Sequence, residues 1–339
     1  MTHPIENIPS TMQPIEPRAV AVRSRAWMYV AGFLLAQIAV VVSAIRITGT
    51  RWFLMHDNYP GLRVLGYSNW AGPLNCDVVL YGDSSALSAL DPKVIEQVTG
   101  LKACNISEGV AVHVVAGSDA PLRSYLARNP PPRFLLSMWT PSDFRPDRPA
   151  FSADTPEGIV YLAQFEGMGA VGREFAHNPL SLPTYAAWTL HAVADGVVAH
   201  VNGPEKDFEV HAQRTSEQGQ WLFPLPAQTK CVRDWLDPGL ILRWDDSVKA
   251  FREKYNTAKT QVFVNISPVP VCDRNYEDYA AKAAGLHDNA FERLPISYYN
   301  QGDVHFSAVG SEYISRKAGE QILSAMRQSD KASGGLQAK

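Results

Sequence analysis

The stretch DVVLYGDSSALSALDP, residues 77–92, decides the fold of this 339-residue chain. Four apolar residues, 78–81, run into Gly82, Asp83 and Ser84, and a segment with helical character follows. A buried strand that leads into a helix is typical of α/β folds, which place ligands at the carboxyl ends of parallel strands. Ser84 therefore either occupies an ordinary turn or is positioned to react.

The segments after this turn alternate between helix and strand. Asp91, Pro92 and Gly100 favour a helix between them, because aspartate caps helix starts, proline suits the first turn and glycine ends helices. In chain order, the other predicted elements are a strand at 102–107, a helix at 110–127, a strand at 133–139, a helix at 247–258, a strand at 260–271, and helices at 276–286 and 308–326. This order predicts an α/β fold, a three-layer α/β/α sandwich with a parallel sheet.

The alternation predicts one large domain that carries an insertion. Residues 145–240 are rich in Pro, Gly and His, and we expect them to form a helical lobe inside a domain that spans 76–327. The predicted flanking segments are a disordered cytoplasmic tail at 1–25, a connector at 46–75 and a disordered tail at 328–339.

Residues 26–45, AWMYVAGFLLAQIAVVVSAI, contain no charged side chain. Twenty helical residues rise about 30 Å, which matches the hydrocarbon core of a bilayer. We expect an uncleaved, single-pass inner-membrane anchor that places the following domain in the periplasm. The alternatives are a signal peptide cleaved near VSA, 42–44, and a buried core helix.

Composition excludes some partners and leaves the state of the cysteines open. The 31 basic and 34 acidic residues nearly balance, so no nucleic-acid partner is expected. The four cysteines, Cys76, Cys104, Cys231 and Cys272, lack the spacing of a zinc site, and neither a metal nor a cofactor is expected. An exported domain permits disulfides, for which Cys231–Cys272 is the preferred pair; the alternative is four free thiols.

A serine needs a base to become a nucleophile, and the chain offers nine histidines as candidates. In QGDVHFSAVGSEYIS, 301–315, Asp303 lies two residues before His305. His305 would accept the proton of Ser84, and Asp303 would orient the ring and stabilise its charged form. The alternative role for His305 is a surface residue that caps the last helix.

These segments resemble the blocks of the SGNH (GDSL-type) hydrolase superfamily. YGDSSALSALDP resembles the first block, with Ser84 as nucleophile. NISEGV resembles the second, whose glycine, here Gly109, supplies an N–H to the oxyanion, and DVHFSAVG resembles the last, with Asp303 and His305. The resemblance covers about 76–145 and 245–326 and leaves the lobe outside.

Two positions depart from the usual family pattern. The aspartate of the last block usually stands three residues before the histidine, where this chain has Gly302; the spacing of Asp303 resembles the alginate-acetylation branch. The third block usually ends in asparagine and aspartate, whereas TPSD, 140–143, puts Ser142 at the asparagine position. The resemblance thus implies oxyanion donors at Ser84, Gly109 and Ser142.

The expected chemistry is acyl transfer through an acyl-serine, from an acyl donor to water or to a sugar hydroxyl. The resemblance implies O-acetylation of a cell-envelope or secreted polysaccharide, with a multispan membrane acyltransferase as partner. A plain periplasmic esterase is the nearest alternative. A catalytically inactive envelope-assembly protein, which binds polysaccharide or a membrane partner, is the alternative from another class.

Overall fold

The computed structural model describes residues 18–48, 50, 67–108, 119–141, 162–179, 181–202, 213–223, 225–231, 244–300 and 305–334. Its strands are β1 Val78–Gly82, β2 Ala103–Asn105, β3 Phe134–Trp139, β4 Gln261–Ile266, β5 Val269–Pro270 and β6 Arg293–Leu294. Its α-helices are α1 Arg18–Thr48, α4 Tyr67–Trp70, α5 Ser84–Ala89, α6 Pro92–Thr99, α7 Ala120–Leu126, α9 Met168–His177, α10 Ser181–Asn202, α12 Trp244–Tyr255, α13 Tyr276–Ala283 and α14 Ala308–Gly334. Two further turns are the π-helix η2 Leu162–Glu166 and the 3₁₀-helix η4 Ile296–Tyr298.

The predicted parallel sheet is confirmed, and it has four strands in the order β2-β1-β3-β4. Val78 of β1 pairs with Ala103 of β2 and with Phe134 of β3, and Phe134 pairs with Gln261 of β4. Strands β1, β2 and β3 are buried along their whole length, as parallel strands with both faces covered usually are. The carboxyl end of β1 therefore lies between the ends of β2 and β3.

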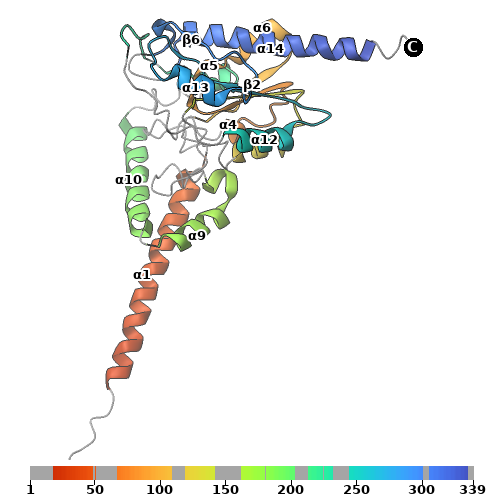
Figure 1. Cartoon of the computed structure of the whole chain (residues 1–339). Coiled ribbons are helices and arrows are strands. Elements are labelled where there is room, and N and C mark those ends of the chain that lie inside the picture. The colour runs from red at the N-terminus through yellow and green to blue at the C-terminus, as the bar shows by residue number, and fades with distance from the viewer. Residues whose placement is uncertain are drawn as a thin grey trace, which may run out of the picture.

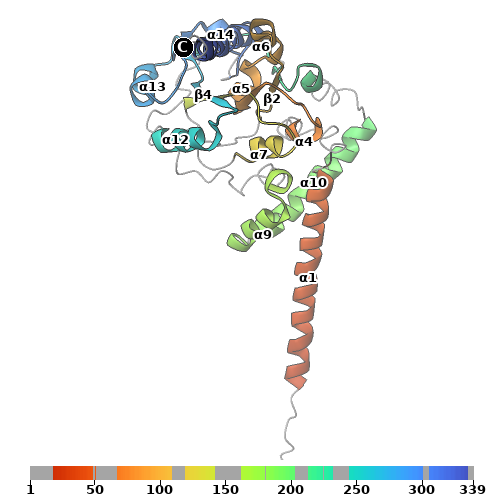
Figure 2. The same cartoon turned by 90° about the vertical axis from the view of Figure 1, so that its right-hand side faces the viewer.

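Alternate residues of the strands pack on opposite faces of this sheet, as the two-residue period of a strand requires. Val79 and Tyr81 of β1 belong to a core with residues of α7, α12 and α13. Val78 and Leu80 belong to a second core with residues of α5, α6 and α14. Figure 2 shows α6 and α14 on one side of the strands and α7 and α12 on the other.

Two predicted elements differ in detail from the structure. The helix around Asp91 is confirmed as α6, with Asp91 as its cap and Gly100 at its end, but the separate short helix α5 precedes it. The single strand predicted at 260–271 is two strands, β4 and β5, because Pro268 has no N–H to donate to a ladder. Strand β5 pairs instead with β6, outside the main sheet.

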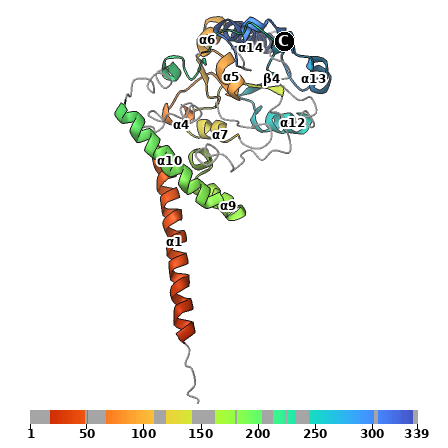
Figure 3. The ribbon, with the colours of Figure 1, turned by 90° about the vertical axis from the view of Figure 1, so that its left-hand side faces the viewer.

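Helix α1 contains the predicted span and is the one helix of the described residues long and apolar enough to cross a membrane. Figure 1 shows it leaving the folded part as an isolated rod, and Trp27, Phe33 and Leu35 on it are exposed. The C-terminal end of α1 is covered, because Val41 and Ile45 pack against residues of η2, α9 and α10. Figure 3 shows α10 crossing this end of α1. The chain thus fits a single-pass membrane protein.

The ends of the first and last helices lie outside their predicted bounds. Helix α1 begins at Arg18, inside the segment predicted as a disordered tail, and α14 continues to Gly334, beyond the predicted end at 326. Alanine and arginine, which occur in both extensions, favour helix. Within the predicted lobe, η2, α9 and α10 are helical; residues 110–118 of another predicted helix lie outside the described residues.

All four cysteines are paired. The predicted Cys231–Cys272 disulfide is confirmed, with 6.2 Å between its Cα atoms. A second disulfide joins Cys76 to Cys104, with 6.0 Å between Cα atoms, and ties the start of the domain to β2. The alternative of four free thiols is therefore wrong.

Candidate active site

The turn after β1 is built around Gly82 and Asp83. A Cβ on Gly82 would lie 2.0 Å from the carbonyl oxygen of Met138 and 2.6 Å from Cβ of Ala86, so only glycine fits. Asp83 is buried and caps α5, because its Oδ1 accepts hydrogen bonds from the Ser85 N–H at 2.7 Å and the Ser85 hydroxyl at 2.6 Å. Its Oδ2 accepts the Thr140 N–H at 2.7 Å, which fastens the turn to the end of β3.

The serines that follow have different surroundings. Ser84 is partly exposed at the first position of α5, whereas Ser85 and Ser88 are fully buried. The Ser85 hydroxyl is bound to Asp83, and the Ser88 hydroxyl lies 3.2 Å from the carbonyl oxygen of Ser84. Among these three serines, Ser84 alone is accessible to a substrate.

His305 lies on a loop that is bound to α5. The Phe306 N–H donates to the Ser88 hydroxyl at 3.3 Å, and the Asn300 N–H donates to the His305 carbonyl at 2.8 Å. Ser88 follows Ser84 by one helical turn, which corresponds to roughly 6 Å along a helix axis. The backbone beside His305 is thus bound one helical turn from Ser84.

Aromatic residues from the end of the predicted lobe cover this region. The Phe223 ring stacks on the His305 ring with 3.8 Å between centroids and 23° between planes. The Trp221 ring lies 4.3 Å from that of Phe223, and the Trp221 N–H donates to the Leu87 carbonyl of α5 at 3.3 Å. Residues 221–223 therefore line the surroundings of His305 and α5.

A buried ion pair lies on the other side of the turn. Glu108 and Arg214 have fully buried side chains whose charged groups are 3.9 Å apart. The Glu108 N–H donates to the Gly82 carbonyl at 3.4 Å, so the pair adjoins the end of β1. Burial lowers the pKa of the Arg214 guanidinium, and Glu108 opposes this effect.

Sequence reasoning missed several polar residues that hold α5 in place. Asn105 is fully buried and donates from Nδ2 to the carbonyls of Ala86 and Leu90, at 3.0 and 2.8 Å, so its role is to bind the end of α5. Gln220 donates from Nε2 to the Ser88 carbonyl at 3.2 Å and to the Ser311 hydroxyl at 2.7 Å. No spacing rule in the sequence links Gln220 to residues about 90 and 130 positions away.

The other predicted site residues, Gly109, Ser142 and Asp303, lie outside the described residues. Within the described residues, no group of three or more His, Cys, Asp or Glu side chains is arranged to hold a metal ion.

Comparison with known proteins found no match for this chain. No family model matches it, and neither a curated protein nor a solved structure is significantly similar.

Proposed function

We propose that this protein is a periplasm-facing serine acyl-ester enzyme that transfers an acyl group from a donor to a hydroxyl of a cell-envelope or secreted polysaccharide. The observation that carries the proposal is a partly exposed Ser84 at the end of a central parallel strand, together with the hydrogen bond from Phe306, next to His305, to Ser88 of the same helix. The described layers also agree with a three-layer sandwich, since α5, α6 and α14 pack on one face and α7, α12 and α13 on the other.

In the first half of the proposed reaction, Ser84 Oγ attacks the acyl carbonyl while His305 accepts the hydroxyl proton. N–H groups at Ser84 and Gly109, with the Ser142 hydroxyl, would stabilise the oxyanion. The tetrahedral intermediate then releases the donor alcohol, which takes the proton from His305, and the acyl group stays on Ser84. Asp303 would orient the His305 ring and stabilise its protonated form.

In the second half, His305 removes a proton from the acceptor hydroxyl, whose oxygen attacks the acyl-serine. The new ester leaves, and Ser84 regains its proton from His305. A sugar hydroxyl must compete with water, so a transferase has to hold the sugar close to the acyl-serine. The partly exposed Phe223, whose ring stacks on that of His305, is a surface on which a sugar ring could rest.

The two disulfides support the compartment in this proposal, because disulfides form and persist in oxidising compartments such as the periplasm. With α1 in the inner membrane, the domain from Cys76 onward would lie outside the cytoplasm. A multispan membrane acyltransferase that supplies the acyl group is the partner we propose.

The test uses the full-length protein in detergent micelles with an activated acetyl ester. Ser84→Ala should lower kcat by at least about 10³-fold, since loss of a serine nucleophile removes the covalent route. The exposed Ser216→Ala is the matched control and should leave kcat unchanged. Equal turnover by Ser84→Ala and the wild type, with equal thermal stability, would rule out the acyl-serine.

Transfer and hydrolysis are separated by adding oligosaccharides to the same reaction and weighing the products by mass spectrometry. Acetylated sugar would support transfer. Release of acetate alone, at a rate that oligosaccharides do not change, would favour a plain esterase. No turnover at all, with the membrane partner present, would favour a binding protein for envelope assembly.

A further inference from the structure

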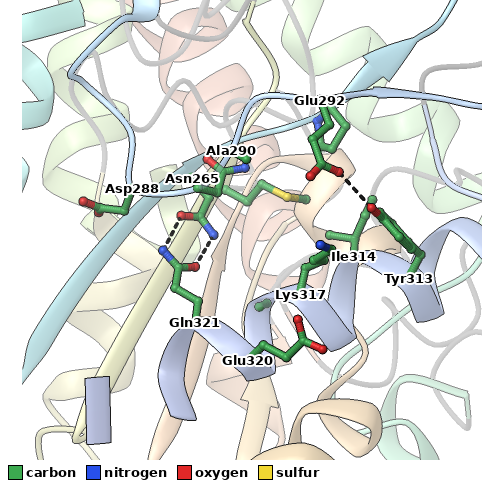
Figure 4. A pocket seen from close by; sticks show the side chains of 13 residues that line it. Asn265, Asp288, Ala290, Glu292, Tyr313, Ile314, Lys317, Glu320 and Gln321 are labelled. Atoms are coloured by element: carbon green, nitrogen blue, oxygen red, sulfur yellow. Dashed lines mark hydrogen bonds between the residues drawn. The ribbon is translucent and has the colours of Figure 1, made fainter. Parts of the chain in front are cut away.

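A cleft distinct from the Ser84 turn lies between α14 and the edge of β4. Its cavity volume is about 330 Å³, which is within the range of small-molecule sites. Met138 and Asn265, both buried, face it from the sheet. The rest of the lining comes from one face of α14 and from Pro268, Asp288, Asn289, Ala290 and Glu292. Figure 4 shows these side chains.

Two amides face each other in the cleft. Asn265 Nδ2 donates to Gln321 Oε1 at 2.9 Å, and Gln321 Nε2 donates to Asn265 Oδ1 at 3.3 Å. An amide carries two N–H donors and an oxygen with two lone pairs, so this exchange uses half the capacity of each. Adjacent donors and acceptors match a hydroxyl group, which both donates and accepts a hydrogen bond.

Carboxylates supply further acceptors. Asp288, Glu292 and Glu320 line the cleft together with one ammonium group, that of Lys317. Glu292 accepts the Tyr313 hydroxyl at 2.9 Å, and a carboxylate has room for several more hydrogen bonds. In Figure 4, the amide pair and the Glu292–Tyr313 pair lie on opposite sides, with Lys317 and Glu320 between them. Asp288 is paired with Arg252 at 2.9 Å, so the negative groups that lie beside Lys317 are Glu292 and Glu320. This remaining excess of negative charge disfavours an anionic ligand.

Apolar groups complete the lining. Pro268, Ala290, Ile314 and Ala318 bring carbon surface to a cleft whose polar groups are mainly amides and carboxylates. A ligand that suits this set has hydroxyls that donate and accept, a C–H surface and no negative charge. These are the properties of a neutral sugar ring.

We propose that this cleft binds a neutral sugar unit of a polysaccharide. The inference goes beyond the proposed function, because binding here needs neither Ser84 nor an acyl group. Asn265 pairs with Met138, which pairs with Gly82, so the floor of the cleft lies two strands from the Ser84 turn, or roughly 10 Å at the usual strand spacing. A polysaccharide held in the cleft would be kept near the turn.

The experiment titrates the full-length protein in detergent micelles with neutral hexasaccharides of gluco, manno and galacto configuration, and with a uronate hexasaccharide, by isothermal calorimetry. At least one neutral sugar should bind saturably, and the uronate at least about tenfold more weakly. Ser84→Ala should bind as the wild type does, so failure of the proposed catalysis is distinguishable from failure of this site.

Two variants locate the binding. Gln321→Met should weaken the neutral sugar about tenfold, because it removes ligand hydrogen bonds and leaves Asn265 without its partner. Gln328→Met, an exposed glutamine on the same helix, is the matched control and should change nothing. Glu320→Lys, at an exposed position, should strengthen uronate binding several-fold without affecting folding.

Three results would overturn the proposal. The first is no binding of any neutral hexasaccharide. The second is tighter binding of the uronate than of every neutral sugar. The third is binding that neither Gln321→Met nor Glu320→Lys alters while both variants unfold at the temperature of the wild type.

Discussion

Arg214 is a fully buried cation that joins the end of the predicted lobe to the loop before Gly109. Its Nη2 donates to the Ser107 carbonyl at 2.9 Å, its Nε donates to the Gly219 carbonyl at 2.9 Å, and Glu108 supplies the opposite charge. Its guanidinium also lies 4.8 Å from the centre of the Tyr67 ring. One side chain thus holds three separate segments of the chain together beside the turn.

Arg214→Met should lower the free energy of unfolding by about 3–5 kcal/mol, because it removes the buried cation that faces the Glu108 carboxylate. Adding Glu108→Gln should recover part of the loss. Urea unfolding of the full-length protein in detergent, followed by tryptophan fluorescence, measures both. A double variant no more stable than Arg214→Met would show that the lost attraction to Glu108 is not the cause.

At this scale, contacts between residues close in sequence could be predicted, and contacts between residues far apart in sequence could not. Gly82, Asp83 and Ser84 form the turn that the sequence indicates, since a glycine after a buried strand is a local signal. Glu108 and Arg214 are 106 residues apart, so no local spacing in the sequence predicts that they form an ion pair. Asn105, an amide with no evident role in the sequence, finds its partners only once α5 is in place.

At the scale of elements, Asp119 links the start of α7 to α12. Its carboxylate accepts hydrogen bonds from Arg123 at 2.7 Å and from Lys254 and Tyr255. Burial alone would raise the pKa of Asp119, but these three donors outweigh it and hold the pKa below its usual value. The ionised form is therefore the one that favours the folded state.

Asp119→Asn should lower the melting temperature at neutral pH and have less effect in acid. A lowered folded-state pKa contributes stability above the unfolded value, about 3.9, and this contribution is lost as the pH falls through the folded value. Melting curves of both proteins from pH 7.5 to pH 3 should converge at the acid end. A difference that stays constant across this range would contradict the ionic role of Asp119.

The bounds of helices and strands matched the prediction where a nearby capping residue sets them. They differed from the prediction where packing against other segments sets them. Asp91 and Gly100 bound α6 as expected. The break between β4 and β5 reflects both Pro268 and the edge of β4, where Asp288 and Asn289 replace a neighbouring strand. The Val264 N–H donates to Asp288 at 2.7 Å and the Ile266 N–H donates to Asn289 at 3.0 Å. Asp288 and Asn289 follow β4 by more than 20 residues, so the sequence could not predict that they bind the edge of this strand.

At the scale of the whole molecule, one apolar helix and two disulfides are the features that concern the cellular compartment of the domain. Helix α1 exposes apolar side chains along most of its length and packs against the rest of the chain only near its end. The span could be predicted because twenty uncharged residues are a composition signal. The packing of Val41 and Ile45 on α9 and α10 could not, because the lobe carries no pattern that specifies its partner.

A topology test follows from this arrangement. Alkaline phosphatase fused after Lys339 should be active in whole cells, since that enzyme folds only where its disulfides can form. A fusion in which the α1 apolar segment is deleted is the control and should be inactive. A well-expressed but inactive full-length fusion would place the domain in the cytoplasm and contradict the proposed topology.

The central claim is that Ser84 is an activated nucleophile, and a fluorophosphonate probe tests it most directly. The reagent forms a stable ester with a serine only where a base removes the hydroxyl proton. After incubation of the full-length protein, digestion and mass spectrometry, we expect one adduct, on Ser84, that is lost in His305→Ala and retained in Ser216→Ala. An unlabelled Ser84, or labelling that persists unchanged in His305→Ala, would contradict it.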